Sequence, residues 1–121
     1  MRVLQVNLHH SRAASAALSV AMRNCDVAFI QEPWTYKGEI KGLKEVGGEL
    51  IYSRSIPHPR TCILVEKGFS ILSMMHHCSR DLTAVKIKTS GGGGPREIVF
   101  GSAYLAYDDV KPLPPGSWRG W

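Results

Sequence analysis

The chain has 121 residues, of which 15 are Lys or Arg and 10 are Asp or Glu, so its formal net charge is +5. This length suits one domain or part of one, and a content of 44% hydrophobic and 21% charged residues excludes a disordered or fibrous chain. No apolar run approaches the roughly 20 residues of a membrane-spanning helix, and the N-terminus lacks the apolar segment of a signal peptide. We therefore expect an intracellular protein that does not enter the membrane.

The three cysteines encode neither a disulfide framework nor a zinc ribbon, because their number is odd and no Cys-x-x-Cys pair occurs. We expect Cys25, Cys62 and Cys78 to be small buried hydrophobic residues. The run His76-His77-Cys78 raises the alternative of a zinc site. Neighbouring side chains of an extended segment point to opposite faces, so at most two of these ligands share one direction, which disfavours that alternative.

The first third of the chain predicts a β-α-β unit. Residues 3–8 mix β-branched and other apolar residues, as in a strand buried largely on both faces. Ser11 can cap a helix over residues 12–23, where apolar residues recur at helical spacing. A second strand over residues 26–31 is stopped by Pro33. The two strands should be parallel and joined by a right-handed crossover.

Short strands without intervening helices dominate the rest of the chain. Residues 34–48 predict an exposed, basic loop broken by glycines. The tetraglycine at 91–94 predicts a hairpin or loop tip between the last two strands, and residues 111–121, rich in Pro and Gly, predict an irregular end. The strand-like runs cover residues 50–53, 61–65, 69–74, 82–88 and 97–105.

One helix cannot cover both faces of about six strands, and a buried sheet needs cover on its second face. The pattern therefore predicts an α/β protein in which a partner covers that face, or in which the chain is the N-terminal portion of a longer α/β domain. The neighbours Arg80 and Asp81 predict a solvated turn pair without a catalytic role.

Two polar residues stand where the first two strands end, the position at which α/β folds place their active residues. Asn7 ends the first strand and Glu32 follows the second, so the two should be neighbours if the strands pair. A carboxylate and a side-chain amide are oxygen ligands suited to Mg²⁺. On the pattern alone, however, both residues are better explained as ordinary turn or capping residues.

Four motifs together resemble a known family. They are LQVNLHHSRAA at 4–14, IQEPW at 30–34, SRDLTAV at 79–85 and SAYLAYDD at 102–109. In this order they resemble the apurinic-endonuclease-like domain of non-LTR retrotransposons, a member of the endonuclease/exonuclease/phosphatase superfamily. The resemblance covers residues 1–115 and leaves 116–121 as an irregular end. It implies the N-terminal part of a four-layer α/β sandwich, in which two mixed sheets pack face to face between helices.

The resemblance also implies roles for three residues. Asn7 in QVNL matches the asparagine that helps to organise the metal and the phosphate, and Glu32 in IQEP matches the glutamate that binds Mg²⁺ (or Mn²⁺). Tyr104 in SAYL matches a tyrosine whose hydroxyl approaches the scissile phosphate. Without the resemblance, Tyr104 is better explained as a core aromatic with its hydroxyl at the rim.

The chain departs from the family in one major respect. The family's Asp-x-Asn motif, a later Asp and a catalytic Ser-Asp-His all follow the tyrosine motif, and none occurs before Trp121. The family usually has a proline where this chain has Ala106, which affects loop geometry more than chemistry. We therefore expect a truncated retrotransposon-derived DNA endonuclease with weak or no activity. Its expected partners are DNA, the missing C-terminal half of the domain and a reverse transcriptase region, and its expected location is the nucleus.

Two other functions are also consistent with the sequence. A catalytically dead fragment would bind nucleic acid through the basic loop that carries Lys37, Lys41 and Lys44. Trp34 would stack on a base or sugar near the site, although a tryptophan beside a strand end more often closes the core. A phosphatase of small phosphate esters is the third reading, because the loops that select DNA lie mostly beyond Trp121 in the family.

Overall fold

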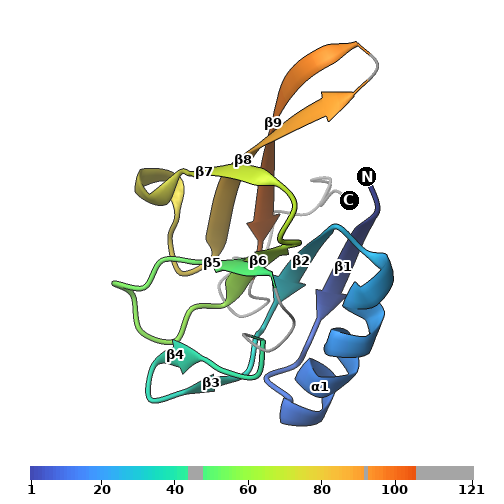
Figure 1. Ribbon diagram of the computed structural model, residues 1–121. Helices are drawn as coiled ribbons and strands as arrows, with labels where there is room; N and C mark the ends of the chain where they lie inside the picture. Colours follow the sequence, from blue (N-terminus) through green and yellow to red (C-terminus); the bar gives the residue numbers. More distant parts are fainter. Residues whose placement is uncertain (44–47, 92, 106–121) are drawn as a thin grey trace, which may run out of the picture.

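The predicted β-α-β unit is present in the computed structural model, which describes residues 1–43, 48–91 and 93–105 (Figure 1). Strands β1 (Val3–Asn7) and β2 (Val27–Gln31) are parallel, and Asn7 lies opposite Gln31 in the register. Helix α1 (Arg12–Ala21) joins them and continues into a 3-10 turn, η1 (Met22–Asn24). Ser11 caps the helix, since its Oγ accepts the backbone N–H of Ala14 at 3.1 Å.

Two more strands complete a four-stranded mixed sheet, which we call the first sheet. Strand β6 (Thr61–Val65) runs antiparallel to β2, and β5 (Glu49–Ile51) runs antiparallel to β6. The strand order is β1-β2-β6-β5. Consecutive residues of β6 point to opposite faces, and all five are buried, so both faces of this sheet are covered along that strand.

The segment predicted as a plain loop contains a small hairpin. Strands β3 (Thr35–Tyr36) and β4 (Glu39–Ile40) pair around a two-residue turn made by Lys37 and Gly38. Both turn residues have positive φ, +52° and +80°, which is the geometry of the turns that suit tight hairpins. The prediction of an irregular loop was therefore wrong for these residues.

The last strands form a second sheet, separate from the first. Strand β7 (Ser70–Ser73) is followed by a 3-10 turn, η3 (Met75–His77), and then by β8 (Leu82–Gly91) and β9 (Gly94–Ala103). The order is β7-β8-β9, and all pairs are antiparallel. The hairpin expected at the tetraglycine is confirmed, because Gly91 lies opposite Gly94.

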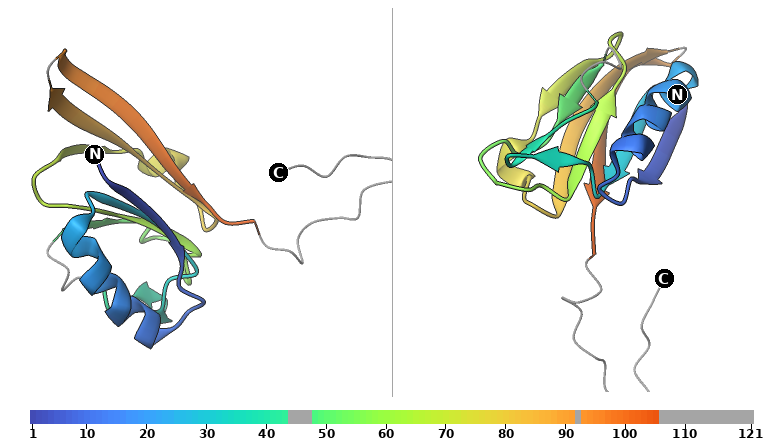
Figure 2. Two further views of the ribbon diagram at one scale, coloured as in Figure 1. Left: turned by 90° about the vertical axis from the view of Figure 1, so that its right-hand side faces the viewer. Right: turned by 90° about the horizontal axis from the view of Figure 1, so that it is seen from below.

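The layers are helix, first sheet and second sheet, as the views in Figure 2 show. The face that the sequence pattern left without cover is thus covered along β2, β6 and β5 by the second sheet of the same chain. One core lies between α1 and the first sheet, and it includes Leu8, Leu18, Ala28, Ile30, Cys62 and Leu64. The other core lies between the sheets and is made by Val27, Ile51, Ile63, Val65, Val85 and Ile87.

The second sheet does not extend over β1. On β1, Val3, Gln5 and Asn7 are exposed, whereas Leu4 and Val6 alternate with them and are partly buried against the helix-side core. On the neighbouring strand β2, Phe29 is covered by Phe100 of β9, with 5.4 Å between the ring centroids. The edge of the molecule at β1 and β9 is therefore open, which leaves the end of β1 accessible. None of the helices in the described part is long and apolar enough to cross a bilayer.

Candidate active site

A hollow of about 520 Å³ lies where β1 and β2 end beneath the end of β9. It is lined by Gln5, Val6, Asn7, Gln31, Ala103, Tyr104 and Leu105. Two of the three residues predicted for catalysis, Asn7 and Tyr104, thus share one hollow although they lie far apart in the sequence. They come from different sheets, because Asn7 ends a strand of the first sheet and Tyr104 follows the last strand of the second.

Glu32, the third predicted residue, is joined to Asn7 through His9. The side-chain Oδ1 of Asn7 accepts the backbone N–H of His9 at 2.8 Å. The Nδ1 atom of His9 lies 3.5 Å from Oε2 of Glu32, whose side chain is only 18% exposed. Both oxygen-bearing side chains are therefore within contact distance of the same histidine, and this places them at one edge of the first sheet.

The backbone of Glu32 is held in an uncommon conformation. Its φ is +48°, and His9 and His10 have φ values of +50° and +56°. Such angles cost a non-glycine residue on the order of 1 kcal/mol and persist where the surroundings fix them. Here the N–H of Glu32 donates to the carbonyl of Arg60 at 2.8 Å, and its own carbonyl accepts from His10 N–H at 2.8 Å. Strain of this kind gathers at functional sites.

Tyr104 is positioned by a pair of charged residues that the sequence did not predict. Its backbone N–H donates to the carbonyl of Asp81 at 2.8 Å, and the guanidinium of Arg60 lies 5.0 Å from the centre of its ring. Arg60 donates two hydrogen bonds to the carboxylate of Asp81, at 2.5 and 2.8 Å. The expectation that Asp81 is only a solvated turn residue was wrong, because it is bound to a residue 21 positions earlier.

Below the hollow, the two sheets are joined by buried polar side chains. Gln31 donates through Nε2 to Oγ of Ser102 at 2.9 Å, and Ser102 Oγ donates to the carbonyl of Ile30 at 3.2 Å. The hydroxyls of Thr61 and Thr83 lie 2.8 Å apart. Across the described residues, no buried side-chain nitrogen or oxygen lacks a hydrogen-bond partner. The side chains beneath the hollow therefore form a polar network in which each buried hydrogen-bonding atom has a partner.

The side-chain oxygen atoms of Asn7 and Glu32 are of the kind that binds Mg²⁺ or Mn²⁺. Asn7 Oδ1 uses one of its two lone-pair directions for His9, which leaves the other available. Within the described ranges, no group of three or more His, Cys, Asp and Glu side chains lies close enough together to hold a metal ion. A metal here would depend on these two residues together with water and phosphate oxygens, which is how Mg²⁺ is commonly held.

At the His-His-Cys run, the rings of His76 and His77 lie against each other with centroids 4.4 Å apart. The sulfur of Cys78 takes no part in this ring contact; it accepts the backbone N–H of Ala84 at 3.3 Å.

Two of the lysines predicted to bind nucleic acid, Lys37 and Lys41, lie in the turn of the β3–β4 hairpin and directly after it, and neither lines the hollow. Lys41 is paired with Glu39 at 3.1 Å, which partly neutralises it. Lys37 is exposed at the turn, where its Nζ lies 5.5 Å from the centre of the Tyr36 ring. Lys44 lies outside the described residues.

Trp34 packs against the helix. The guanidinium of Arg12 lies 5.5 Å from the centre of its ring. A Cβ added at Gly42 would come within 3.2 Å of the indole and within 3.3 Å of Cβ of Ser15. Gly42 also has a φ of +83°, so the tight approach of the chain to Trp34 needs glycine there. These contacts are those of a structural residue beside a strand end, and the stacking of Trp34 on a base stays a prediction.

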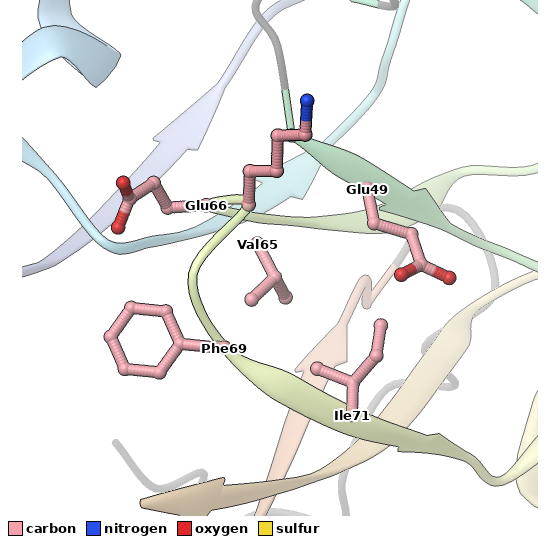
Figure 3. Close-up of a pocket in the computed structure, with 7 residues that line it drawn as sticks. Glu49, Val65, Glu66, Phe69 and Ile71 are labelled. Carbon is pink, nitrogen blue, oxygen red and sulfur yellow. The ribbon is translucent and has the colours of Figure 1, made fainter.

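A second hollow, of about 320 Å³, lies at the other end of the layer between the sheets (Figure 3). Its walls include Val65, Phe69 and Ile71, and the carboxylates of Glu49 and Glu66 lie on opposite sides of it. Since these carboxylates do not converge on one point, this hollow is a weaker candidate for a metal-dependent site than the one at Asn7.

Comparison with known proteins supports the fold. No protein-family model and no curated protein sequence matches this chain. Among solved structures, the chain is similar to the endonuclease domain of TRAS1, a telomere-specific non-LTR retrotransposon, with a TM-score of 0.64 and 23% sequence identity. The match covers 89% of this chain and 46% of that one, so the chain spans about half the length of the structure it matches. The chain therefore has the α/β sandwich fold of an endonuclease domain over the matched part.

Proposed function

We propose that this chain contributes one half of the active site of a Mg²⁺- or Mn²⁺-dependent DNA endonuclease derived from a non-LTR retrotransposon. The observation that carries the proposal is that Asn7 and Tyr104, from two sheets, line one open hollow, while His9 contacts both Asn7 and Glu32. The likeness of the fold to a retrotransposon endonuclease domain supports it. The expected setting is nuclear DNA, where a nick would prime reverse transcription.

Each residue has a distinct task in this proposal. The carboxylate of Glu32 and the amide oxygen of Asn7 would hold the metal, which would supply positive charge for the phosphate and the leaving oxygen. The hydroxyl of Tyr104 donates a hydrogen bond to a phosphate oxygen. His9 keeps the Asn7 amide oriented through its backbone N–H.

The groups that would orient the attacking water are the Asp, Asn and His motifs of the family, which this chain does not contain. We therefore expect slow nicking from this chain alone. Those groups are expected from the complementary half of the fold.

The test is nicking of supercoiled plasmid by the purified chain, with Mg²⁺ or Mn²⁺ and with chelator, after circular dichroism has shown that the chain is folded. Glu32→Ala should lower the rate by about 100-fold or more, and Asn7→Ala and Tyr104→Phe by about 10- to 100-fold. Glu66→Ala is the matched control, since it removes an exposed carboxylate at the other hollow and should leave the rate unchanged. Nicking that survives chelation, or that is the same in Glu32→Ala, would contradict the proposal.

A binding fragment without activity is the second candidate, favoured by the exposed cation of Lys37 and by the net charge of +5. Binding of this kind weakens steeply with salt, because each phosphate contact releases counterions. Lys37→Ala should then reduce the slope of log affinity against log salt by about 1. Binding whose affinity does not change with salt would exclude this candidate.

A further inference from the structure

The proposed site is divided between two sheets, so its geometry depends on what fixes one sheet relative to the other. Glu32 follows a strand of the first sheet, and Tyr104 follows a strand of the second. A small sliding or rotation of the sheets would change the separation between the metal ligands and the tyrosine hydroxyl. A misplacement of about 1 Å can lower a rate by on the order of 100-fold.

Arg60 and Asp81 connect the two sheets at this point. Arg60 immediately precedes β6 of the first sheet, and Asp81 immediately precedes β8 of the second. The guanidinium donates to both carboxylate oxygens, at 2.5 and 2.8 Å, and its side chain is only 19% exposed. The backbone N–H of Arg60 also donates to the carbonyl of Arg80 at 2.9 Å. A two-pronged bond of this kind fixes direction as well as distance.

Each member of this pair also holds one of the proposed functional residues. The carbonyl of Arg60 accepts the N–H of Glu32 at 2.8 Å. The carbonyl of Asp81 accepts the N–H of Tyr104 at 2.8 Å, and the Arg60 guanidinium lies 5.0 Å from the centre of that tyrosine's ring. Glu32 is thus connected to Tyr104 in two ways, through Arg60 directly and through the Arg60–Asp81 pair.

We propose that Arg60 and Asp81 are positioning residues that set the distance between the metal ligand Glu32 and the phosphate-binding hydroxyl of Tyr104. This inference rests on the proposed function. A purely structural ion pair would add stability without controlling that distance. A positioning pair must instead move Tyr104 when it is broken, while the metal ligands, held by backbone bonds and by His9, stay in place.

The experiment uses the full chain with 3-fluorotyrosine in place of its four tyrosines, followed by ¹⁹F NMR. The resonance of Tyr104 is identified as the one lost in Tyr104→Phe. Added Mn²⁺ broadens each resonance according to the inverse sixth power of its distance from the metal. Loss of the broadening in Glu32→Ala identifies the metal at the proposed site.

In the wild-type protein, Mn²⁺ should broaden Tyr104 more than any other described tyrosine. Arg60→Ala and Asp81→Asn should shift the Tyr104 resonance and reduce its broadening at least twofold, with Mn²⁺ affinity changed less than about threefold. In the nicking assay the same variants should lower kcat about tenfold with little change in KM. Arg60→Lys should lie between wild type and Arg60→Ala, because lysine keeps the charge but not the planar fork.

Arg54 provides a matched control. Its guanidinium lies 4.5 Å from the centre of the Tyr52 ring and donates to the Tyr52 hydroxyl at 3.0 Å, so it forms a comparable arginine–tyrosine pair elsewhere. Arg54→Ala should shift only the Tyr52 resonance.

Two results would overturn the inference, and they differ from each other. If Arg60→Ala and Asp81→Asn lower the melting temperature but leave the shift and broadening of Tyr104 as in wild type, the pair is structural only. If Mn²⁺ fails to broaden Tyr104 in the wild-type protein, or does so equally in Glu32→Ala, the proposed metal site itself is wrong and the positioning role fails with it. Asp81→Asn keeps the experiment decisive if Arg60→Ala does not fold.

Discussion

The layer between the two sheets has two regions that are equally buried but chemically different. The apolar region holds Val27, Ile63, Val65, Val85 and Ile87, each at most 1% exposed. The polar region, at the end nearest the candidate site, holds Thr61, Thr83, Gln31 and Ser102, which are 0 to 7% exposed. Apolar contacts have little directional preference, whereas hydrogen bonds require set distances and angles. The first region therefore supplies cohesion, and the second fixes how the sheets lie relative to each other where the site is built.

The largest effect should come from removing a side chain of the apolar region. Ile63→Ala should lower the free energy of unfolding by about 3 kcal/mol, because the residue is fully buried and its loss leaves a cavity between two sheets that cannot close it. Urea unfolding followed by circular dichroism measures this change.

Val99→Ala serves as the comparison for this substitution. Val99 lies on β9 and is 56% exposed, so its truncation should cost less than about 0.5 kcal/mol. If the two substitutions cost the same, the layer between the sheets is not packed as the structure has it.

The polar region should show smaller and coupled effects. Thr83 Oγ1 lies 2.8 Å from Thr61 Oγ1 and 3.2 Å from the carbonyl of Thr61. Thr83→Val removes both bonds and leaves the Thr61 hydroxyl buried without its partner, at a cost of about 2 kcal/mol. Thr61→Val spares the bond from Thr83 to the carbonyl and should cost about 1 kcal/mol.

The double variant Thr61→Val/Thr83→Val tests whether the two hydroxyls interact with each other or act independently. Because the second substitution removes a group that has already lost its partner, the two changes together should cost about 1 kcal/mol less than their sum. Simple additivity in urea unfolding, or a greater cost for Thr61→Val than for Thr83→Val, would show that these hydroxyls do not bond as described.

The sequence predicted the parts of this fold whose signals are local. The helical spacing after Ser11 predicted α1, and the tetraglycine predicted the turn between β8 and β9. The division of the strands into two sheets was implied only by the family resemblance, because the residue pattern of strands in either sheet has the same period of two. The β3–β4 hairpin was missed because its strands have only two residues each.

The candidate site was predicted from sequence only in part. Asn7 and Glu32 could be placed by the rule that functional residues stand at strand ends, and Tyr104 by resemblance to a family. The structure places Asn7 and Tyr104 at one hollow and Glu32 beside it, while their roles stay predictions. Arg60 and Asp81 had no signal in the sequence, since a contact across 21 residues between two sheets follows from tertiary packing.

The smallest effect should come from the other face of β6, where Cys62 alternates with Thr61 and Ile63. Cys62 is completely buried in the helix-side core, and burial raises the pKa of its thiol above the value in the unfolded chain. As pH rises, the unfolded chain loses this proton first. The stability that Cys62 contributes is therefore fully present below about pH 8.5 and declines above it.

A thiol titration checks this prediction. At pH 8, two of the three cysteines, the partly exposed Cys25 and Cys78, should react with a disulfide reagent well before the third. The Cys62→Val variant should lose only the slow phase, and its stability should depend less on pH above 8.5 than that of wild type. Rapid reaction of all three thiols in the folded protein would mean that water reaches this face of β6. The helix-side core would then admit water, whereas the apolar and polar regions on the opposite face of β6 exclude it.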